Sequence, residues 1–176
     1  VAEGSLRPVR GPVSARTSRV KLPFEGGLTR ADWEALSRDP KATVAYHAAQ
    51  FLQMMDAGKP VPESLDYMVQ VWTFDGDLCL VNLPGEVVVD YGLRLKRMLP
   101  RDRVWVNSYT NDVPCYIPSQ RVWEEGGYEA AGAMIYYGRP TRFATGVETI
   151  IFAAGGISRP LSRGIAPRRD DAMLRA

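Results

Sequence analysis

One glutamate stands where a sequence of this kind can place a reactive carboxylate. Glu86 follows Leu83-Pro84-Gly85, directly after an apolar run that has the character of a strand, and helical spacing begins just beyond it. Strand ends in α/β folds converge on ligand clefts, and the unpaired N–H groups at a helix start favour an ionised carboxylate. An ionised carboxylate can bind a metal ion. Glu86 is therefore a candidate metal ligand, with simple helix capping as the alternative.

A loop rich in polar and aromatic residues is the second candidate. It runs from Asn107 to Pro118 and includes Tyr109 and Tyr116. Loops of this composition often carry function, although a packed surface loop with buried tyrosine rings would have the same composition. Three further tyrosines lie on an apolar stretch with helical spacing, where core packing is the simpler interpretation: Tyr128, Tyr136 and Tyr137.

The elements that must position these residues follow from hydrophobic periodicity. Alternation predicts a strand over 65–74, Asp75-Gly76 predicts a hairpin turn, and the wholly apolar run 78–81 is typical of a central strand covered on both faces. A shorter strand is expected over 103–107. Helical spacing predicts helices from Thr29 (with a capping box to Asp32), over 42–58, over 87–99, over 122–137 and over 147–154. The predicted fold class is α/β, a mixed β-sheet flanked by helices.

Composition narrows the range of functions. The chain has 176 residues, enough for one core, and 22 basic against 20 acidic residues give a formal charge of +2, which argues against nucleic acid as a partner. Basic residues gather among Gly, Pro and Ser at the two ends, so we expect a loose N-terminal arm over 1–28 and a loose C-terminal tail over 155–176, around a domain over 29–154. No apolar run reaches the length of a membrane-spanning helix. Two cysteines cannot make a disulfide framework.

Four short blocks, in order, resemble the neutral, non-lysosomal ceramidase family. The similarity covers 65–138, and it implies a partial catalytic domain of mixed α/β fold in which zinc activates water to hydrolyse the amide of ceramide. It also implies a lipid amide substrate, transient contact with a membrane surface, and a secreted or cell-envelope location. The blocks are Leu83-Pro84-Gly85-Glu86, Asn107-Ser108-Tyr109-Thr110, Tyr116-Ile117-Pro118-Ser119 and Gly127-Tyr128-Glu129-Ala130.

The resemblance assigns roles to three residues. Glu86 matches a zinc-binding glutamate of the family. A tyrosine in the following block is another ligand there; this chain departs from the pattern by an apparent insertion, and alignment back from the last block places Tyr116 at that position, with Tyr109 as the second choice. Tyr128 matches a tyrosine that donates a hydrogen bond to the oxyanion formed during attack, a role suited to a preorganised donor.

The ligand set implied by this family is incomplete in the chain. Its remaining zinc ligands are histidines from sequence upstream, whereas this chain has a single histidine, His47, in a helical context typical of a structural residue. The resemblance therefore implies a fragment that needs the upstream half of the same catalytic domain. Two alternatives stay open: a non-catalytic module that binds a lipid or a protein partner, and an amidohydrolase with a different substrate.

Overall fold

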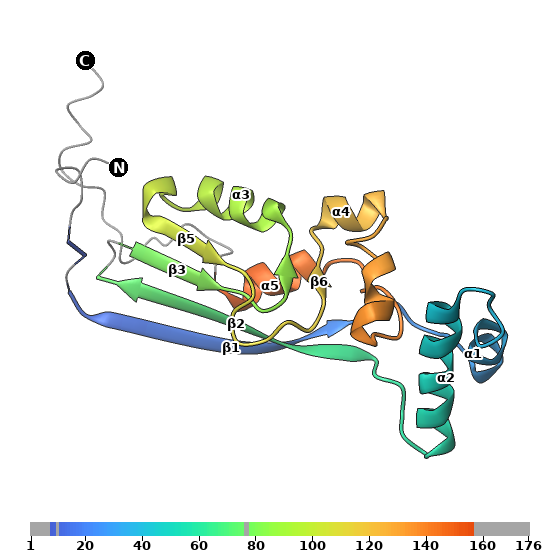
Figure 1. The fold of residues 1–176 in the computed structure, drawn as a ribbon. Helices are drawn as coiled ribbons and strands as arrows, with labels where there is room; N and C mark the ends of the chain where they lie inside the picture. The colour runs from blue at the N-terminus through green and yellow to red at the C-terminus, as the bar shows by residue number, and fades with distance from the viewer. Residues whose placement is uncertain (1–7, 10, 76–77, 157–176) are drawn as a thin grey trace.

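The fold is built on a four-stranded mixed sheet (Figure 1). The computed structural model describes residues 8–9, 11–75 and 78–156. The strand order is β1-β2-β3-β5, in which β1–β2 and β2–β3 are antiparallel and β3–β5 is parallel. The predicted mixed α/β class is confirmed. The strands are β1 (Val13–Pro23), β2 (Ser64–Phe74), β3 (Leu78–Asn82) and β5 (Val104–Asn107).

A second, two-stranded sheet and the helices complete the architecture. Strand β4 (Glu86–Val87) pairs in parallel with β6 (Tyr116–Ile117). The helices are α1 (Arg30–Leu36), α2 (Ala42–Asp56), α3 (Val89–Met98), α4 (Gln120–Glu125) and α5 (Val147–Ala154), with 3-10 turns η2 (Arg101–Arg103) and η3 (Gly132–Tyr137). Within the described residues, none of these helices is long and apolar enough to cross a membrane.

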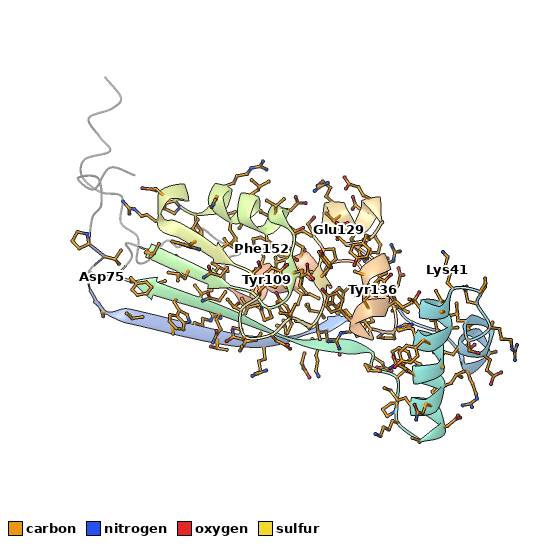
Figure 2. The ribbon with its side chains drawn as sticks, viewed as in Figure 1. Lys41, Asp75, Tyr109, Glu129, Tyr136 and Phe152 are labelled. Atoms are coloured by element: carbon orange, nitrogen blue, oxygen red, sulfur yellow. The ribbon has the colours of Figure 1, made fainter. Side chains whose placement is uncertain are left out.

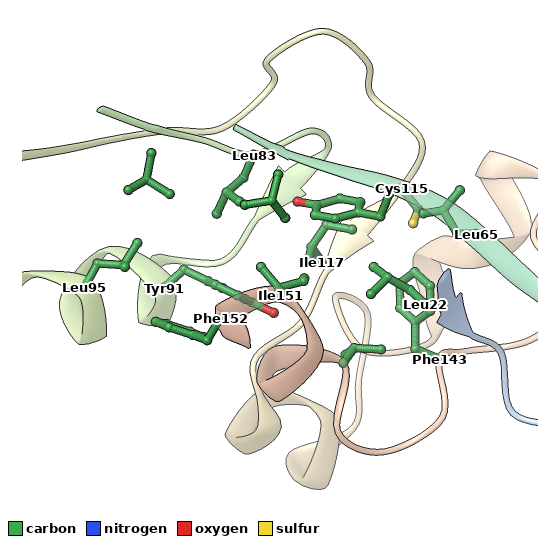
Figure 3. Close-up of a cluster of buried hydrophobic side chains, with 14 of the residues drawn as sticks. Leu22, Leu65, Leu83, Tyr91, Leu95, Cys115, Ile117, Phe143, Ile151 and Phe152 are labelled. Carbon is green, nitrogen blue, oxygen red and sulfur yellow. The ribbon is translucent and has the colours of Figure 1, made fainter. Parts of the chain in front are cut away.

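The main hydrophobic core lies between one face of the sheet and the helices α3 and α5 (Figure 3). Tyr91 of α3 stacks on Phe152 of α5 with ring centroids 5.7 Å apart, and both rings are buried. The Tyr91 hydroxyl donates to the carbonyl of Pro118 at 3.1 Å, which satisfies the polar end of a fully buried side chain. Val69 and Val81 supply the sheet side of this core.

Helices α1 and α2 form a separate unit between β1 and β2, at one end of the molecule (Figure 1). The predicted capping box is confirmed, because the Thr29 side chain accepts from the Asp32 backbone and the Asp32 carboxylate accepts from the Thr29 backbone. The unit has its own apolar cluster around Trp33 and Phe51, whose rings stack at 4.6 Å.

The prediction of a loose arm over 1–28 is wrong for residues 13–23, which form β1. Leu22 is fully buried and Val20 packs against the main core, while Lys21 points outward and pairs with Asp66 at 2.7 Å. The basic residues of this segment hide its alternation of buried and exposed positions from a sequence reading. The alternation follows from the antiparallel pairing of β1 with all eleven residues of β2. Most of the expected C-terminal tail, residues 157–176, lies outside the described residues.

The helix expected over 122–137 is interrupted. Helix α4 ends at Glu125, and the next two residues, Gly126 and Gly127, have φ values of 74° and 88°. Positive φ ends a right-handed helix, so the chain turns at this point and resumes only as the 3-10 turn η3. This turn changes where the tyrosines beyond it point.

Candidate functional site

Glu86 lies in a strand and not at a helix start. It pairs with Tyr116 across the short β4–β6 ladder, and α3 begins only at Val89 with Val88 as its N-cap. The expectation that a helix terminus stabilises the Glu86 carboxylate is therefore wrong. The helix predicted beyond Glu86 is present, but the two-residue strand β4 comes before it, so the N-cap is Val88 and not Glu86.

A glycine turn fixes the backbone that presents Glu86. Gly85 has φ +81°, and a Cβ at this position would lie 2.5 Å from the carbonyl oxygen of Cys115. Only glycine allows this close approach between the 83–86 turn and the strand β6. The turn is further held by the Tyr67 hydroxyl, which donates to the Pro84 carbonyl at 2.9 Å. The position of the carboxylate thus depends on a residue of β2 deep in the core.

Tyrosine hydroxyls from two other segments converge on Glu86. The Tyr109 hydroxyl donates to Oε2 at 2.9 Å, and the Tyr137 hydroxyl donates to Oε1. Tyr109 lies in the loop after β5 and has φ +57°, which is rare for a bulky residue and is held by its N–H bond to the Gly85 carbonyl. Tyr137 comes from η3, so each carboxylate oxygen of Glu86 accepts a hydrogen bond from a different segment of the chain.

These contacts set the protonation of the group. Hydroxyls of Tyr137, then Tyr116 and Tyr109, donate toward Glu86 and lower the pKa of its carboxyl, while partial burial opposes them. The same interaction with Glu86 raises the pKa of Tyr116 to about 12 and raises the pKa values of Tyr137 and Tyr109. Glu86 is thus an anion at neutral pH, and the surrounding phenols keep their protons.

Two more tyrosines extend the cluster outward. The Tyr128 ring meets the Tyr116 ring edge-on at a centroid distance of 5.7 Å, and Tyr136 lies 6.3 Å from Tyr128. Tyr128 and Tyr136 are 51% and 66% exposed, so the expectation that they pack in the core is wrong. Tyr109, in the loop after β5, is 56% exposed, and it is labelled with Tyr136 of η3 in Figure 2. We call the six residues the Glu86 cluster: Glu86, Tyr109, Tyr116, Tyr128, Tyr136 and Tyr137.

The structure brings together every site residue that the sequence singled out. Tyr109 and Tyr116 both face Glu86, so the open choice between them is not decided by proximity. Tyr137 packs against the main core, as expected, but its hydroxyl also reaches Glu86, which the helical spacing did not indicate. The adjacent glycines at 126 and 127 were the signal that the helix stops.

His47 has a structural role, as expected. Its Nε2 lies 2.9 Å from the Arg139 carbonyl oxygen, and its ring packs edge-on against Trp33 and Phe51. Burial lowers the pKa of His47. Both cysteines, Cys79 and Cys115, are buried free thiols.

The described residues supply only oxygen donors to a metal at the Glu86 cluster. No group of three or more His, Cys, Asp or Glu side chains that could hold a metal ion occurs among them. Searches of protein-family models, curated proteins and solved structures return no match to this chain. The Glu86 cluster and the four sequence blocks are therefore the features of the chain that bear on its function.

The ionised carboxylate of Glu86 fits a zinc ligand in charge and atom type. The Tyr116 phenol fits less readily, because its proton must leave and its pKa of about 12 exceeds that of a free phenol near 10. A zinc ion bound to the Glu86 carboxylate would favour the negatively charged form of Tyr116, and so would promote loss of the phenol proton. The donor set thus fits part of a zinc site, and a complete site needs further ligands.

Proposed function

We propose that this chain contributes the carboxylate and tyrosine side of a zinc-dependent amidohydrolase of the neutral ceramidase type, an enzyme that cleaves the N-acyl amide bond of ceramide or a related lipid amide. The observation that carries the proposal is the convergence of Tyr109, Tyr116 and Tyr137 on one ionised glutamate, Glu86. Glu86 and Tyr137 are 51 positions apart in the sequence, and three of the four residues, Glu86, Tyr109 and Tyr116, lie in the blocks that resemble the family.

Glu86 and Tyr116 would hold the metal, and Tyr109 and Tyr137 would keep the carboxylate oriented. Zinc supplies a Lewis acid and an activated water when it is bound. Metal ligands depend on neighbouring hydrogen bonds for their orientation, which is the role that these two hydroxyls have toward Glu86. The remaining ligands must come from a polypeptide segment outside the residues described.

Tyr128 would donate a hydrogen bond to the substrate carbonyl oxygen. Its ring borders that of the ligand candidate Tyr116, and the residue is 51% exposed. A donor fixed next to the metal ligands stabilises the negative charge that develops on the carbonyl oxygen during attack. The lipid character of the substrate depends on the family resemblance.

Zinc content tests the proposal directly. We would load the purified chain with zinc and measure stoichiometry by plasma mass spectrometry, beside Glu86→Gln, Tyr116→Phe and the remote control Tyr46→Phe. The chain and the control should retain substoichiometric zinc that a weak chelator removes, and Glu86→Gln should retain none. Zinc content that is indifferent to both cluster variants would overturn the assignment.

The main alternative is a non-catalytic module that binds a lipid surface. The observation in its favour is the pair of exposed aromatic rings, Tyr128 and Tyr136, since tyrosine is well suited to the boundary between water and lipid. Co-sedimentation with anionic liposomes at graded salt tests it. Binding that is lost in a Tyr128→Ser, Tyr136→Ser double variant but kept in Glu86→Gln would favour this alternative.

A further inference from the structure

The Glu86 cluster combines one negative charge with several aromatic rings. Three phenols, those of Tyr137, Tyr116 and Tyr109, lower the pKa of the Glu86 carboxyl, so it is ionised at neutral pH. The carboxylate in turn raises the pKa of Tyr116 to about 12, and this phenol keeps its proton. The charge is therefore a single carboxylate, and the phenols that donate to it are neutral. A carboxylate beside tyrosine rings attracts cations, because the face of each ring is itself electron-rich.

The rings of the cluster are close enough together to share one cation. Between ring centroids, Tyr116 lies 5.7 Å from Tyr128 and 6.4 Å from Tyr137, with interplanar angles of 71° and 81°. Tyr136 extends this group, 6.3 Å from Tyr128. A cation interacts with a ring when it lies within about 6 Å of the ring centroid. These spacings allow one cation to lie within that distance of Tyr116 and of a neighbouring ring.

Several tyrosines of the cluster are exposed to solvent, and one of them is held by two hydrogen bonds. Tyr109, Tyr128 and Tyr136 are 56%, 51% and 66% exposed. The Tyr109 hydroxyl donates to Glu86 at 2.9 Å, and its backbone N–H donates to the Gly85 carbonyl at 3.0 Å. Part of each exposed residue is open to a ligand, and a ring that is already fixed loses less conformational entropy when the ligand binds.

The hydrogen bonds of Glu86 indicate which kind of cation is suited to the cluster. Its Oε1 accepts from Tyr137 and its Oε2 accepts from Tyr109, so both oxygens already have a donor. A primary ammonium such as that of lysine carries N–H donors and is strongly hydrated, so it needs acceptors to replace its water. A quaternary ammonium has no N–H donor. It needs a negative charge nearby and ring faces to contact, and the cluster supplies both.

We propose that the Glu86 cluster binds a quaternary ammonium group, such as the trimethylammonium group of choline. The rings of Tyr116 and Tyr128 would contact the methyl groups, and Glu86 would provide the opposite charge. This site uses residues of the proposed zinc site but does not depend on zinc. Both ligands need the charge of Glu86, so bound zinc and a bound ammonium group exclude each other.

An NMR titration of the zinc-free chain tests the proposal. We would compare choline with its neutral carbon isostere, in which a tert-butyl group replaces the trimethylammonium group, at constant ionic strength. Choline should bind with a dissociation constant on the order of millimolar, and the isostere at least about fivefold more weakly, since it keeps the shape and lacks the charge. Tyr128→Leu should weaken choline binding by about three- to fivefold and Glu86→Gln by about tenfold. Tyr46→Leu, at a tyrosine 68% exposed on α2, should leave choline binding unchanged.

Equal binding of choline and the isostere, choline binding that both cluster variants leave unchanged, or no binding at all would each overturn the proposal. Tyr128 is exposed, so Tyr128→Leu keeps the test decisive if Glu86→Gln fails to fold. Zinc content separates this proposal from the zinc site. Choline binding by a chain that retains no zinc refutes the zinc site alone, and Glu86-dependent zinc without choline binding refutes the ammonium site alone.

Phosphatidylcholine vesicles then identify the source of the ammonium group. A chain that co-sediments with the vesicles, and does so less in Tyr128→Leu, takes the group from a lipid headgroup. A chain that binds free choline and stays in the supernatant takes the group from a small soluble molecule.

Discussion

Replacement of Gly85 by alanine should be the most damaging single-methyl change at the candidate site. The new Cβ would stand 2.5 Å from the Cys115 carbonyl oxygen, a backbone atom that cannot rotate away, and the backbone has φ +81°. The unfavourable conformation costs about 1–3 kcal/mol and the forced contact about 1–3 kcal/mol more. We therefore expect the free energy of unfolding to fall by about 2–6 kcal/mol, from a typical total of about 5–15 kcal/mol.

Alanine substitutions at two other glycines separate the cost of the backbone conformation from the cost of the close contact. Gly138 has φ +60° with nothing within 4 Å of a new Cβ, so Gly138→Ala carries the backbone cost alone, about 1–2 kcal/mol. Gly132 has an ordinary φ and only ordinary contacts, the nearest at 3.5 Å from the Tyr128 ring, so Gly132→Ala should be close to neutral. Urea denaturation followed by tryptophan fluorescence gives all three values. If Gly85→Ala costs no more than Gly138→Ala, the close approach of the 83–86 turn to β6 is refuted.

Three further predictions concern the core, pH and thiol chemistry. Tyr67→Phe leaves the buried Pro84 carbonyl without its donor and should lower the free energy of unfolding by about 1–3 kcal/mol in the same urea assay, with an effect below about 0.5 kcal/mol counting against that bond. Arg121 lowers the pKa of Asp90 in the folded chain, so this pair stabilises the fold above the unfolded pKa of about 4 and the gain is lost as pH falls below it. Asp90→Asn should therefore flatten the fall in Tm over acidic pH, and an unchanged slope would contradict the linkage. Burial raises the pKa of Cys115 to about 12, so an aromatic disulfide reagent at pH 8 should label neither cysteine until the chain is unfolded, and rapid labelling of the native chain would contradict the packing.

The sequence alone predicted most regular elements, because their periodicity is local. The alternation over β2, the apolar run of β3 and the capping box at Thr29 all appear where expected. Strand β1 was missed because its basic residues hide the alternation of Val20 and Leu22, and only a partner strand reveals it. The prediction that β3 is covered on both faces is not met within the described residues, where Leu80 on its open side is only half-buried.

The sequence singled out most residues of the candidate site, but it did not predict how they are arranged. Glu86, Tyr116 and Tyr128 were found from short blocks, but no pattern indicated that Glu86 would lie in a strand paired with Tyr116. Tyr137 was missed because its approach to Glu86 depends on a turn at two glycines, a feature that interrupts an otherwise helical pattern. Contacts between segments far apart in sequence depend on the tertiary fold, which periodicity does not encode.

The junction between β1 and β2 has a consequence for how this chain can be altered. Pro23 and Ser64 face each other in the ladder, and the Phe24 N–H donates to the Glu63 carbonyl at 2.9 Å. The α1–α2 unit therefore leaves the sheet and returns to it at a single point, so the sheet already holds the two ends of this long excursion together. A short turn grafted across that junction would keep the β1–β2 register, but it would also remove the contact between His47 and the Arg139 carbonyl, two residues beyond Tyr137 of the Glu86 cluster. The excursion is thus closed at its base by the sheet and is tied to the scaffold at its far side by α2, next to the turn η3 that supplies two tyrosines of the cluster.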